Sequence, residues 1–195
     1  FTARSSFRSV LIDGTVHTID DWNKVVPLKK KGEQWLYIAL PPSLHFSFAV
    51  QGLKKGFNLI IEKPLSTNRA SSEELLKISK SMKLKLFEVN MYPFHNQLQL
   101  LRNYYSFMEE GTVDVRFSIP KLPKDDFRYN NDLGGGAMLD LGFYPLSLLV
   151  ILSKKFQLLD QNIVYNNNID TSGSVSAIID NRIHFKGSWA LDSTY

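Results

Sequence analysis

The sequence contains no cysteine. It therefore has no thiolate nucleophile, disulfide scaffold, iron–sulfur cluster or cysteine-ligated zinc finger. It also has no uninterrupted apolar run of the roughly 18 residues that a membrane helix needs. The most apolar stretch, 137–152, is broken by Asp140, Gly142 and Pro145. The N-terminus shows no signal-peptide pattern, so we expect a soluble, cytoplasmic protein.

Charge of either sign is modest. The 195 residues include 23 Lys and Arg against 19 Asp and Glu, a net charge of +4, and 44% are hydrophobic. This composition excludes a disordered tail and favours a folded chain with a substantial core. The basic residues are scattered, and Lys29–Lys31 is typical of a solvated loop, so nucleic-acid binding is not expected. No metal is expected either, because ligand spacing is missing among His17, His45, His95 and His184.

The first half alternates apolar runs with helical patterns. We expect helices to begin at Ser43, as an N-cap, and at a capping box formed by Ser71 and Glu74. The expected strands are 35–40, 57–62 and 84–91. Nearly continuous apolar strands separated by helices favour a parallel sheet with both faces covered.

The second half has a different pattern. The expected elements are a helix over 96–110, a strand over 113–119, a polar loop over 120–132, an apolar helix ending at Leu152, and a hairpin of 175–179 with 183–189. Alternation in the strands indicates a sheet with one wet face. The change of pattern near Tyr92 predicts two domains, 1–92 and 93–195.

The first candidate site residues lie where the expected parallel strands end, because ligands bind at that edge of such sheets. Lys63 follows the second strand and would place a cation in the crevice, where it could hold a substrate hydroxyl. The alternative is a solvated lysine that pairs with Glu62.

A second group of candidates surrounds the three glycines 134–136. Glycines before a helix allow a ligand to approach the backbone and leave the amides of the first turn free. Asp140 and Tyr144 lie four residues apart and would share a helix face. The alternative is a plain glycine loop and a core tyrosine whose hydroxyl has a partner.

Two runs, IALPPSLHFSFAVQGLKKGFNLIIEKPLS and LGGGAMLDLGFYPLS, occur in this order. Together they resemble the glucose–fructose oxidoreductase/inositol dehydrogenase/rhizopine-catabolism (Gfo/Idh/MocA) family of NAD(P)-dependent oxidoreductases, in its tyrosine-type branch. The resemblance extends from Ala3 to the segment 169–189. It implies an α/β chain: a partial, doubly wound parallel Rossmann domain (1–92) and an α+β domain with an open, mostly antiparallel sheet (93–195). In the family that sheet often forms oligomer contacts.

The resemblance also implies roles for single residues. Lys63 matches the lysine beside the nicotinamide, often followed by a cis peptide bond to the Pro64 equivalent. Asp140 and Tyr144 match the helix pair that faces the substrate, and Arg128 matches a substrate-side loop. The cofactor-contacting residues implied are Arg4, Ser5, Leu40, Pro41, His45, Glu62, Lys63 and Asn90.

These roles imply hydride transfer between NADP or NAD and a carbinol or carbonyl carbon of a sugar, polyol or related substrate. Tyr144 would exchange the proton of the substrate hydroxyl. Lys63 would lower the pKa of Tyr144 and orient that hydroxyl. Asp140 would position Lys63 and Tyr144 or hold a sugar hydroxyl. The roles of Lys63 and Tyr144 could be exchanged. Arg4 can pair with a 2′-phosphate, which slightly favours NADP.

The sequence departs from the family pattern in three ways. It has no G-x-G-x-x-G fingerprint, so about 30 upstream residues of strand, turn and helix are expected to be missing. Pro93 and Asn96 stand where relatives often have arginine and proline. The second domain of relatives continues beyond the equivalent of Tyr195, so the chain looks truncated at both ends. A non-catalytic relative that senses nicotinamide or acts as a scaffold is the alternative, although Lys63 and Tyr144 favour an enzyme.

Overall fold

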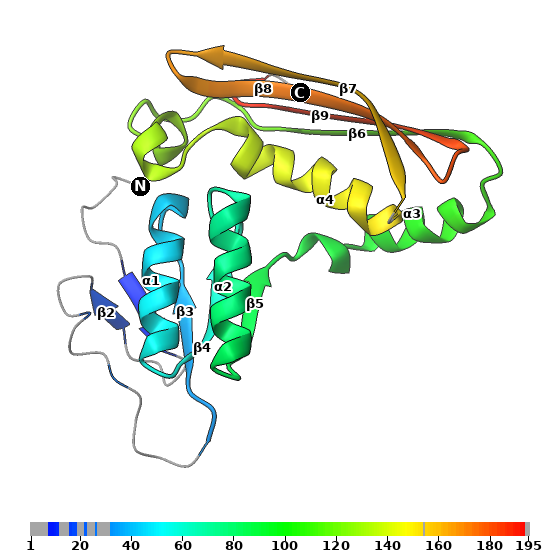
Figure 1. Cartoon of the computed structure of the whole chain (residues 1–195). Coiled ribbons are helices and arrows are strands. Elements are labelled where there is room, and N and C mark those ends of the chain that lie inside the picture. The colour runs from blue at the N-terminus through cyan, green and yellow to red at the C-terminus, as the bar shows by residue number, and fades with distance from the viewer. Residues whose placement is uncertain are drawn as a thin grey trace. The chain divides into compact units, whose positions relative to one another are not determined.

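The structure is a computed structural model that describes residues 8–11, 16–18, 22, 26, 32–153 and 155–193. Its residues divide into two compact units, drawn in Figure 1. The first comprises the described residues up to Asn90 together with Asp132–Gly134, and the second comprises Met91–Asn131 and the chain from Gly135 onward.

The first unit contains a five-stranded sheet in the order β2-β1-β3-β4-β5. Its strands are β1 (Arg8–Leu11), β2 (Val16–Thr18), β3 (Trp35–Ile38), β4 (Asn58–Glu62) and β5 (Leu86–Val89). β3, β4 and β5 are parallel, which confirms the prediction for these three strands. β1 is antiparallel to both β2 and β3, a pairing that the sequence did not predict.

Two helices connect the parallel strands, as parallel pairing requires. α1 (Pro42–Lys54) begins at Pro42, a residue suited to the first helical turn, so Ser43 lies inside the helix. α2 (Arg69–Ser81) is capped by Asn68, whose side-chain oxygen accepts the N–H of Ser71 at 2.9 Å. The predicted capping box at Ser71 is therefore wrong, because Asn68 already occupies the N-cap.

The core of the first unit lies between α1, α2 and the sheet. Its fully buried side chains include Leu36, Ile38, Leu53, Phe57, Leu59, Ile61 and Leu75. A Cβ on Gly52 would lie 2.9 Å from side-chain carbons of Leu36 and Leu59, so this glycine lets α1 approach the sheet closely.

The second unit contains a four-stranded sheet in the order β6-β9-β8-β7. Its strands are β6 (Gly111–Ser118), β7 (Phe156–Asn166), β8 (Ile169–Ile179) and β9 (Ile183–Ala190). β7, β8 and β9 are antiparallel, which confirms the predicted hairpin, whereas β6 pairs with β9 in parallel. β7 was missed, because a register shift between Leu158 and Asp160 interrupts its alternation.

Helices cover one face of this sheet (Figure 1). α3 (Asn96–Phe107), a π-helical turn (Met138–Gly142) and α4 (Phe143–Leu152), which follows that turn directly, bury alternate residues of β8 and β9. The buried strand residues include Val175, Ala177, Ile179, Ile183, Phe185 and Trp189.

The stretch 131–152 is long and apolar enough to cross a membrane by length and composition alone. The core helix of a soluble protein passes the same test. Here Leu141, Leu148 and Leu149 are buried in the core of the second unit, and Asp140 forms an ion pair with Arg128. These contacts are those of a core helix.

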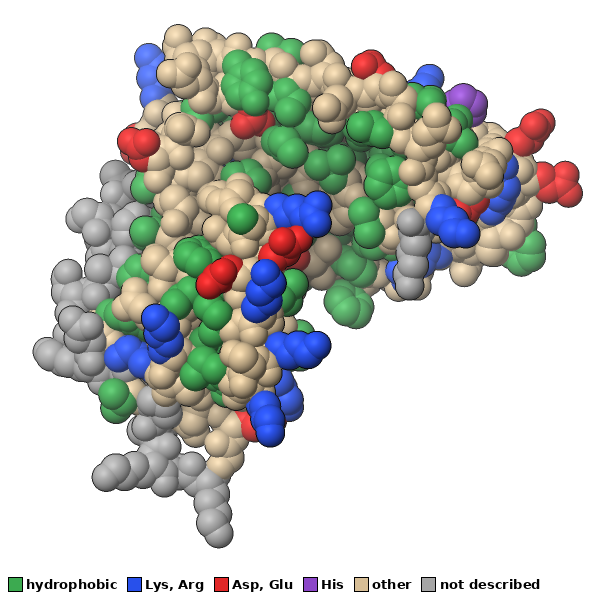
Figure 2. Space-filling view, in the orientation of Figure 1, with side chains coloured by type: hydrophobic (Ala, Val, Ile, Leu, Met, Phe, Trp, Pro, Cys, Tyr) green, Lys and Arg blue, Asp and Glu red, His purple; other side chains and the backbone are tan. Residues whose placement is uncertain are grey.

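Lys and Arg side chains lie in several separate places on the face seen in Figure 2. They alternate there with Asp, Glu and uncharged side chains and do not join into one basic patch.

Candidate active site

The three parallel strands of the first unit end at one edge of the sheet. Ile38 pairs with Ile61, and Glu62 pairs with Val89, so the residues that follow each strand emerge side by side. Ligands bind at this edge in sheets of this kind. The sequence-predicted residues at these ends are Leu40, Pro41, Glu62, Lys63 and Asn90; Arg4 and Ser5 lie outside the described residues.

Lys63 directly follows Glu62, the last residue of β4. The peptide bond between Lys63 and Pro64 is cis, as the family resemblance implied. The Tyr37 hydroxyl on β3 donates a hydrogen bond to the Glu62 carboxylate. Burial and this bonded carboxylate raise the pKa of Tyr37 to about 12. Glu62 is thus fixed against the neighbouring strand.

The loop after Lys63 is held from two further sides. The N–H of Leu65 donates to the carboxylate of Glu88 on β5 at 2.6 Å. The His45 ring, which is completely buried, lies 2.7 Å from the carbonyl oxygen of Pro64 through Nδ1 and 2.7 Å from that of Leu40 through Nε2. His45 therefore reaches two strand-end loops at once from within α1.

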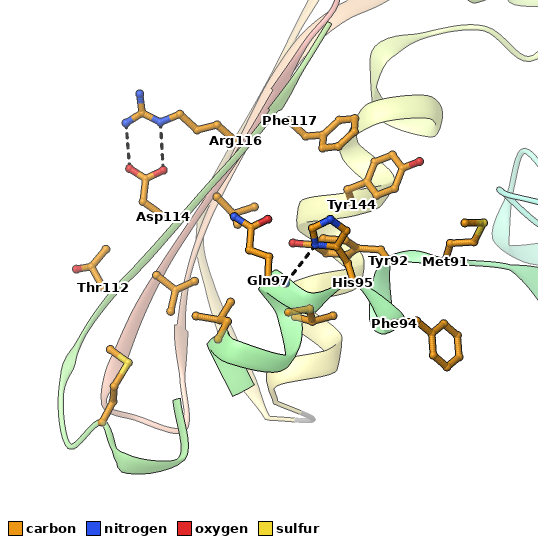
Figure 3. A pocket seen from close by; sticks show the side chains of 15 residues that line it. Met91, Tyr92, Phe94, His95, Gln97, Thr112, Asp114, Arg116, Phe117 and Tyr144 are labelled. Atoms are coloured by element: carbon orange, nitrogen blue, oxygen red, sulfur yellow. Dashed lines mark hydrogen bonds and ion pairs between the residues drawn. The ribbon is translucent and has the colours of Figure 1, made fainter. Parts of the chain in front are cut away.

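Asp140 and Tyr144 lie in the second unit, Asp140 in the π-helical turn and Tyr144 in the first turn of α4. Single π-helical turns occur frequently at functional sites. The Tyr144 ring stacks on Phe117 with centroids 4.1 Å apart, and it meets the Tyr92 ring edge to face at 5.8 Å (Figure 3). Aromatic packing on two sides fixes the ring of Tyr144.

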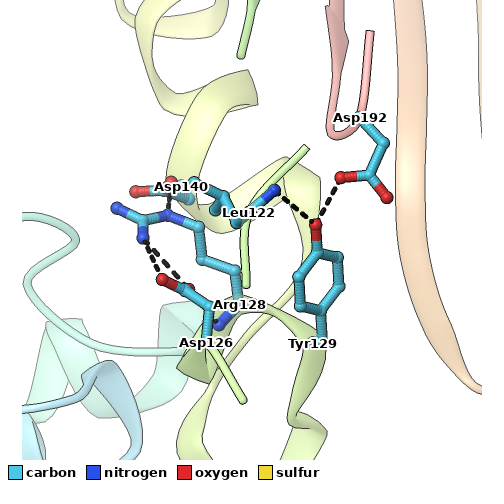
Figure 4. A network of polar contacts seen from close by, with 6 residues as sticks. All are labelled: Leu122, Asp126, Arg128, Tyr129, Asp140 and Asp192. Carbon is cyan, nitrogen blue, oxygen red and sulfur yellow. Dashed lines mark hydrogen bonds and ion pairs between the residues drawn. The ribbon is translucent and has the colours of Figure 1, made fainter. Parts of the chain in front are cut away.

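Arg128 ties Asp140 into a polar network (Figure 4). Its Nε donates to the Asp140 carboxylate, and its Nη1 donates to Asp126 at 3.1 Å. The Arg128 and Asp140 side chains are only 27% and 14% exposed. Burial alone would lower the pKa of Arg128, but the hydrogen bonds and charges of Asp140 and Asp126 raise it. The structure thus brings together Arg128 and Asp140, two of the three residues predicted on the substrate side.

Gly136 makes a close contact that the sequence did not predict. Gly136 has φ +109°, and a Cβ there would lie 2.0 Å from Oδ1 of Asp170 on β8. The N–H of Met138 donates to Oδ2 of Asp170 at 2.5 Å. The expectation that the first-turn amides are free is therefore wrong at Met138, because Asp170 accepts its N–H.

Asp170 is a residue that sequence reasoning missed. Burial raises the pKa of its carboxyl, although bonds from the backbone N–H groups of Met138 and Ala137 act in the opposite direction. Gly136 in turn donates its N–H to the Arg128 carbonyl at 2.9 Å. The glycine run thus links the start of the π-helical turn to the loop that carries Arg128.

A cavity of about 940 Å³ lies in the second unit and is bordered by Tyr144 (Figure 3). Its volume is in the range of small-molecule sites. Apart from an exposed Asp114–Arg116 ion pair (3.0 Å), its lining is mainly aromatic and aliphatic. The apolar lining includes Met91, Tyr92, Phe94, Leu98, Leu101 and Phe117. Within the described ranges, no three His, Asp or Glu side chains gather closely enough to hold a metal ion.

Residues 9–90 match the model of the Gfo/Idh/MocA family, described as an oxidoreductase family with an NAD-binding Rossmann fold. A dTDP-3,4-didehydro-2,6-dideoxy-alpha-D-glucose 3-reductase from Actinomadura kijaniata is 36% identical over 117 residues, which cover 57% of this chain and 34% of that protein. Over residues 9–90, the chain is similar to the Gfo/Idh/MocA family.

Two further relatives are also similar to this chain. A D-xylose 1-dehydrogenase (NADP(+)) from Haloferax volcanii is 28% identical over 116 residues, covering 57% of this chain and 35% of the dehydrogenase. The structure of a 3-ketoreductase from Actinomadura kijaniata, in complex with NADP and TDP-benzene, superposes with a TM-score of 0.74 at 25% identity. That superposition covers 82% of this chain and 51% of the reductase. The matches thus span about a third of the curated relatives and about half of the solved chain.

Proposed function

We propose that this protein is an NAD(P)-dependent oxidoreductase that transfers a hydride to or from a carbinol or carbonyl carbon of a sugar or related substrate. The observation that carries the proposal is the Lys63 loop, held at the carboxyl edge of a parallel sheet by His45 and Glu88. The relatives, a sugar-nucleotide 3-reductase and a xylose dehydrogenase, support a sugar substrate.

The residues at the sheet edge fit the nicotinamide half of the cofactor. Lys63 supplies a cation there, and the turn at Leu40 and Pro41 supplies an apolar wall. The sequence contains no G-x-G-x-x-G turn, which is the usual seat of the pyrophosphate. The relatives named with NADP favour NADP over NAD. When bound, the cofactor supplies or accepts the hydride.

The protein's own residues handle the substrate oxygen. Tyr144, its ring fixed by Phe117 and Tyr92, exchanges the hydroxyl proton. The Lys63 ammonium donates a hydrogen bond to the same oxygen and stabilises its developing negative charge. Asp140, held by Arg128, positions the hydroxyl or binds a neighbouring sugar hydroxyl.

The proposal also assigns roles to the two units. The first unit binds the cofactor, and the second binds the substrate and forms homo-oligomer contacts through its sheet. We place the protein in the cytoplasm, without nucleic-acid or membrane partners.

A substrate scan tests the proposed function. Aldoses, polyols and dTDP-linked sugars are each mixed with the protein and oxidised or reduced NADP or NAD, and the absorbance of the reduced nicotinamide is followed. We expect turnover of at least one sugar, faster with NADP. Cofactor binding without turnover of any of them would contradict the proposal and favour a nicotinamide-sensing role.

A further inference from the structure

His45 connects two loops that the proposed function uses. Its helix, α1, is anchored to the sheet through buried Ala49 and Leu53. From this fixed position, Nδ1 contacts the carbonyl of Pro64, the residue after Lys63, and Nε2 contacts the carbonyl of Leu40, the residue before Pro41. One side chain therefore sets the separation of the loops after β3 and β4.

The chemistry of these two contacts defines the state of the ring. A backbone carbonyl oxygen can only accept a hydrogen bond, and a neutral imidazole has only one N–H. Both ring nitrogens of His45 lie 2.7 Å from carbonyl oxygens. A neutral ring would point a nitrogen lone pair at one of these oxygens, in a place closed to water, whereas an imidazolium donates to both.

We propose that His45 is a positioning residue for Lys63 and acts as an imidazolium whose two N–H groups hold the Leu40 and Pro64 carbonyls. The imidazolium bridge stands on the geometry alone, whereas its effect on Lys63 rests on the proposed function. His45 itself, being completely buried, acts through the two loops and not by contact with substrate.

Two substitutions separate the two contacts. The amide nitrogen of His45→Asn takes the place of Nδ1 and can still donate to Pro64, while that of His45→Gln takes the place of Nε2 and can still donate to Leu40. We expect His45→Gln to lower kcat about tenfold or more, because a misplaced catalytic group is costly, and to keep the KM for cofactor within about threefold. His45→Asn should do the reverse, raising the cofactor KM and largely keeping kcat.

The matched control is His184→Gln, on an exposed position of β9, which should change neither parameter. A purely structural His45 would give two variants whose activities fall together in proportion to the folded fraction measured by circular dichroism. That outcome would overturn the positioning role.

Nuclear magnetic resonance tests the bridge without turnover and without a His45 variant that must fold. The chain is labelled with ¹⁵N-histidine, and the ring nitrogens are assigned by removing the other three histidines (His17, His95 and His184) one at a time. At pH 7.5 we expect both His45 nitrogens to show shifts of the protonated type, because each lies 2.7 Å from a carbonyl oxygen. One unprotonated nitrogen would overturn the imidazolium bridge. An inactive parent chain with a protonated His45 would instead count against the proposed function.

Discussion

The Arg128–Asp140 pair should couple strongly, unlike an exposed pair of similar type in the same unit. At an effective dielectric constant of about 20, unit charges about 4 Å apart attract by roughly 4 kcal/mol. Lost hydration offsets part of this attraction. Because both side chains are more than two-thirds buried, we expect a coupling free energy of about 2 kcal/mol.

A double-mutant cycle measures that coupling. Arg128→Gln, Asp140→Asn and the double variant are compared with the parent by urea unfolding followed by circular dichroism. The control cycle uses Arg116→Gln and Asp114→Asn, whose side chains are 77% and 44% exposed, so their coupling should be clearly weaker. Equal coupling in the two cycles would refute the claim that Arg128 holds Asp140 in place.

Two further predictions concern stability. Gly136→Ala should destabilise the protein by about 2 kcal/mol or more in urea unfolding, because its Cβ would meet Asp170. Gly32→Ala, also at positive φ but with no atom of the described residues within 4 Å of the added Cβ, should cost only about 1 kcal/mol, and equal losses would contradict the assigned contact. Burial and the hydrogen bond to Asp180 raise the pKa of Tyr105 to about 12. The protonated Tyr105 hydroxyl therefore contributes fully to the free energy of unfolding below pH 10. This contribution is lost as the pH rises from about 10 to 12. In urea unfolding curves measured over a pH series, Tyr105→Phe should lose less stability than the parent between pH 10 and pH 12. An unchanged pH profile would contradict the role of Tyr105.

The sequence predicted the parallel strands because each is a short apolar run followed by proline and a helix. It did not predict β7, whose register shift disrupts the two-residue period, or the parallel pairing of β6 with β9, which joins segments far apart in the chain. The N-cap of α2 was misplaced by a few residues because Asn68 and Ser71 both suit that position. Local patterns thus defined most elements but not their long-range pairing.

The candidate site was only partly visible in the sequence. Lys63, Asp140 and Tyr144 stood out through their spacing and the family resemblance. Gly136 lies close to Asp170, more than thirty residues later, and no local pattern connects the two. The sequence placed His45 at the start of a helix, but its two carbonyl contacts depend on how α1 packs beside the strand ends.

The most direct test of the role of Lys63 in catalysis is to measure both the turnover and the cofactor affinity of the Lys63→Met variant. The control is Lys77→Met, an exposed lysine on α2. Titration calorimetry with NADP and steady-state rates on the best sugar of the scan are compared for parent and variants. We expect Lys63→Met to lower kcat by at least about a hundredfold and to leave the Kd for NADP within a few fold, while Lys77→Met changes neither. Unimpaired turnover of Lys63→Met would contradict the account.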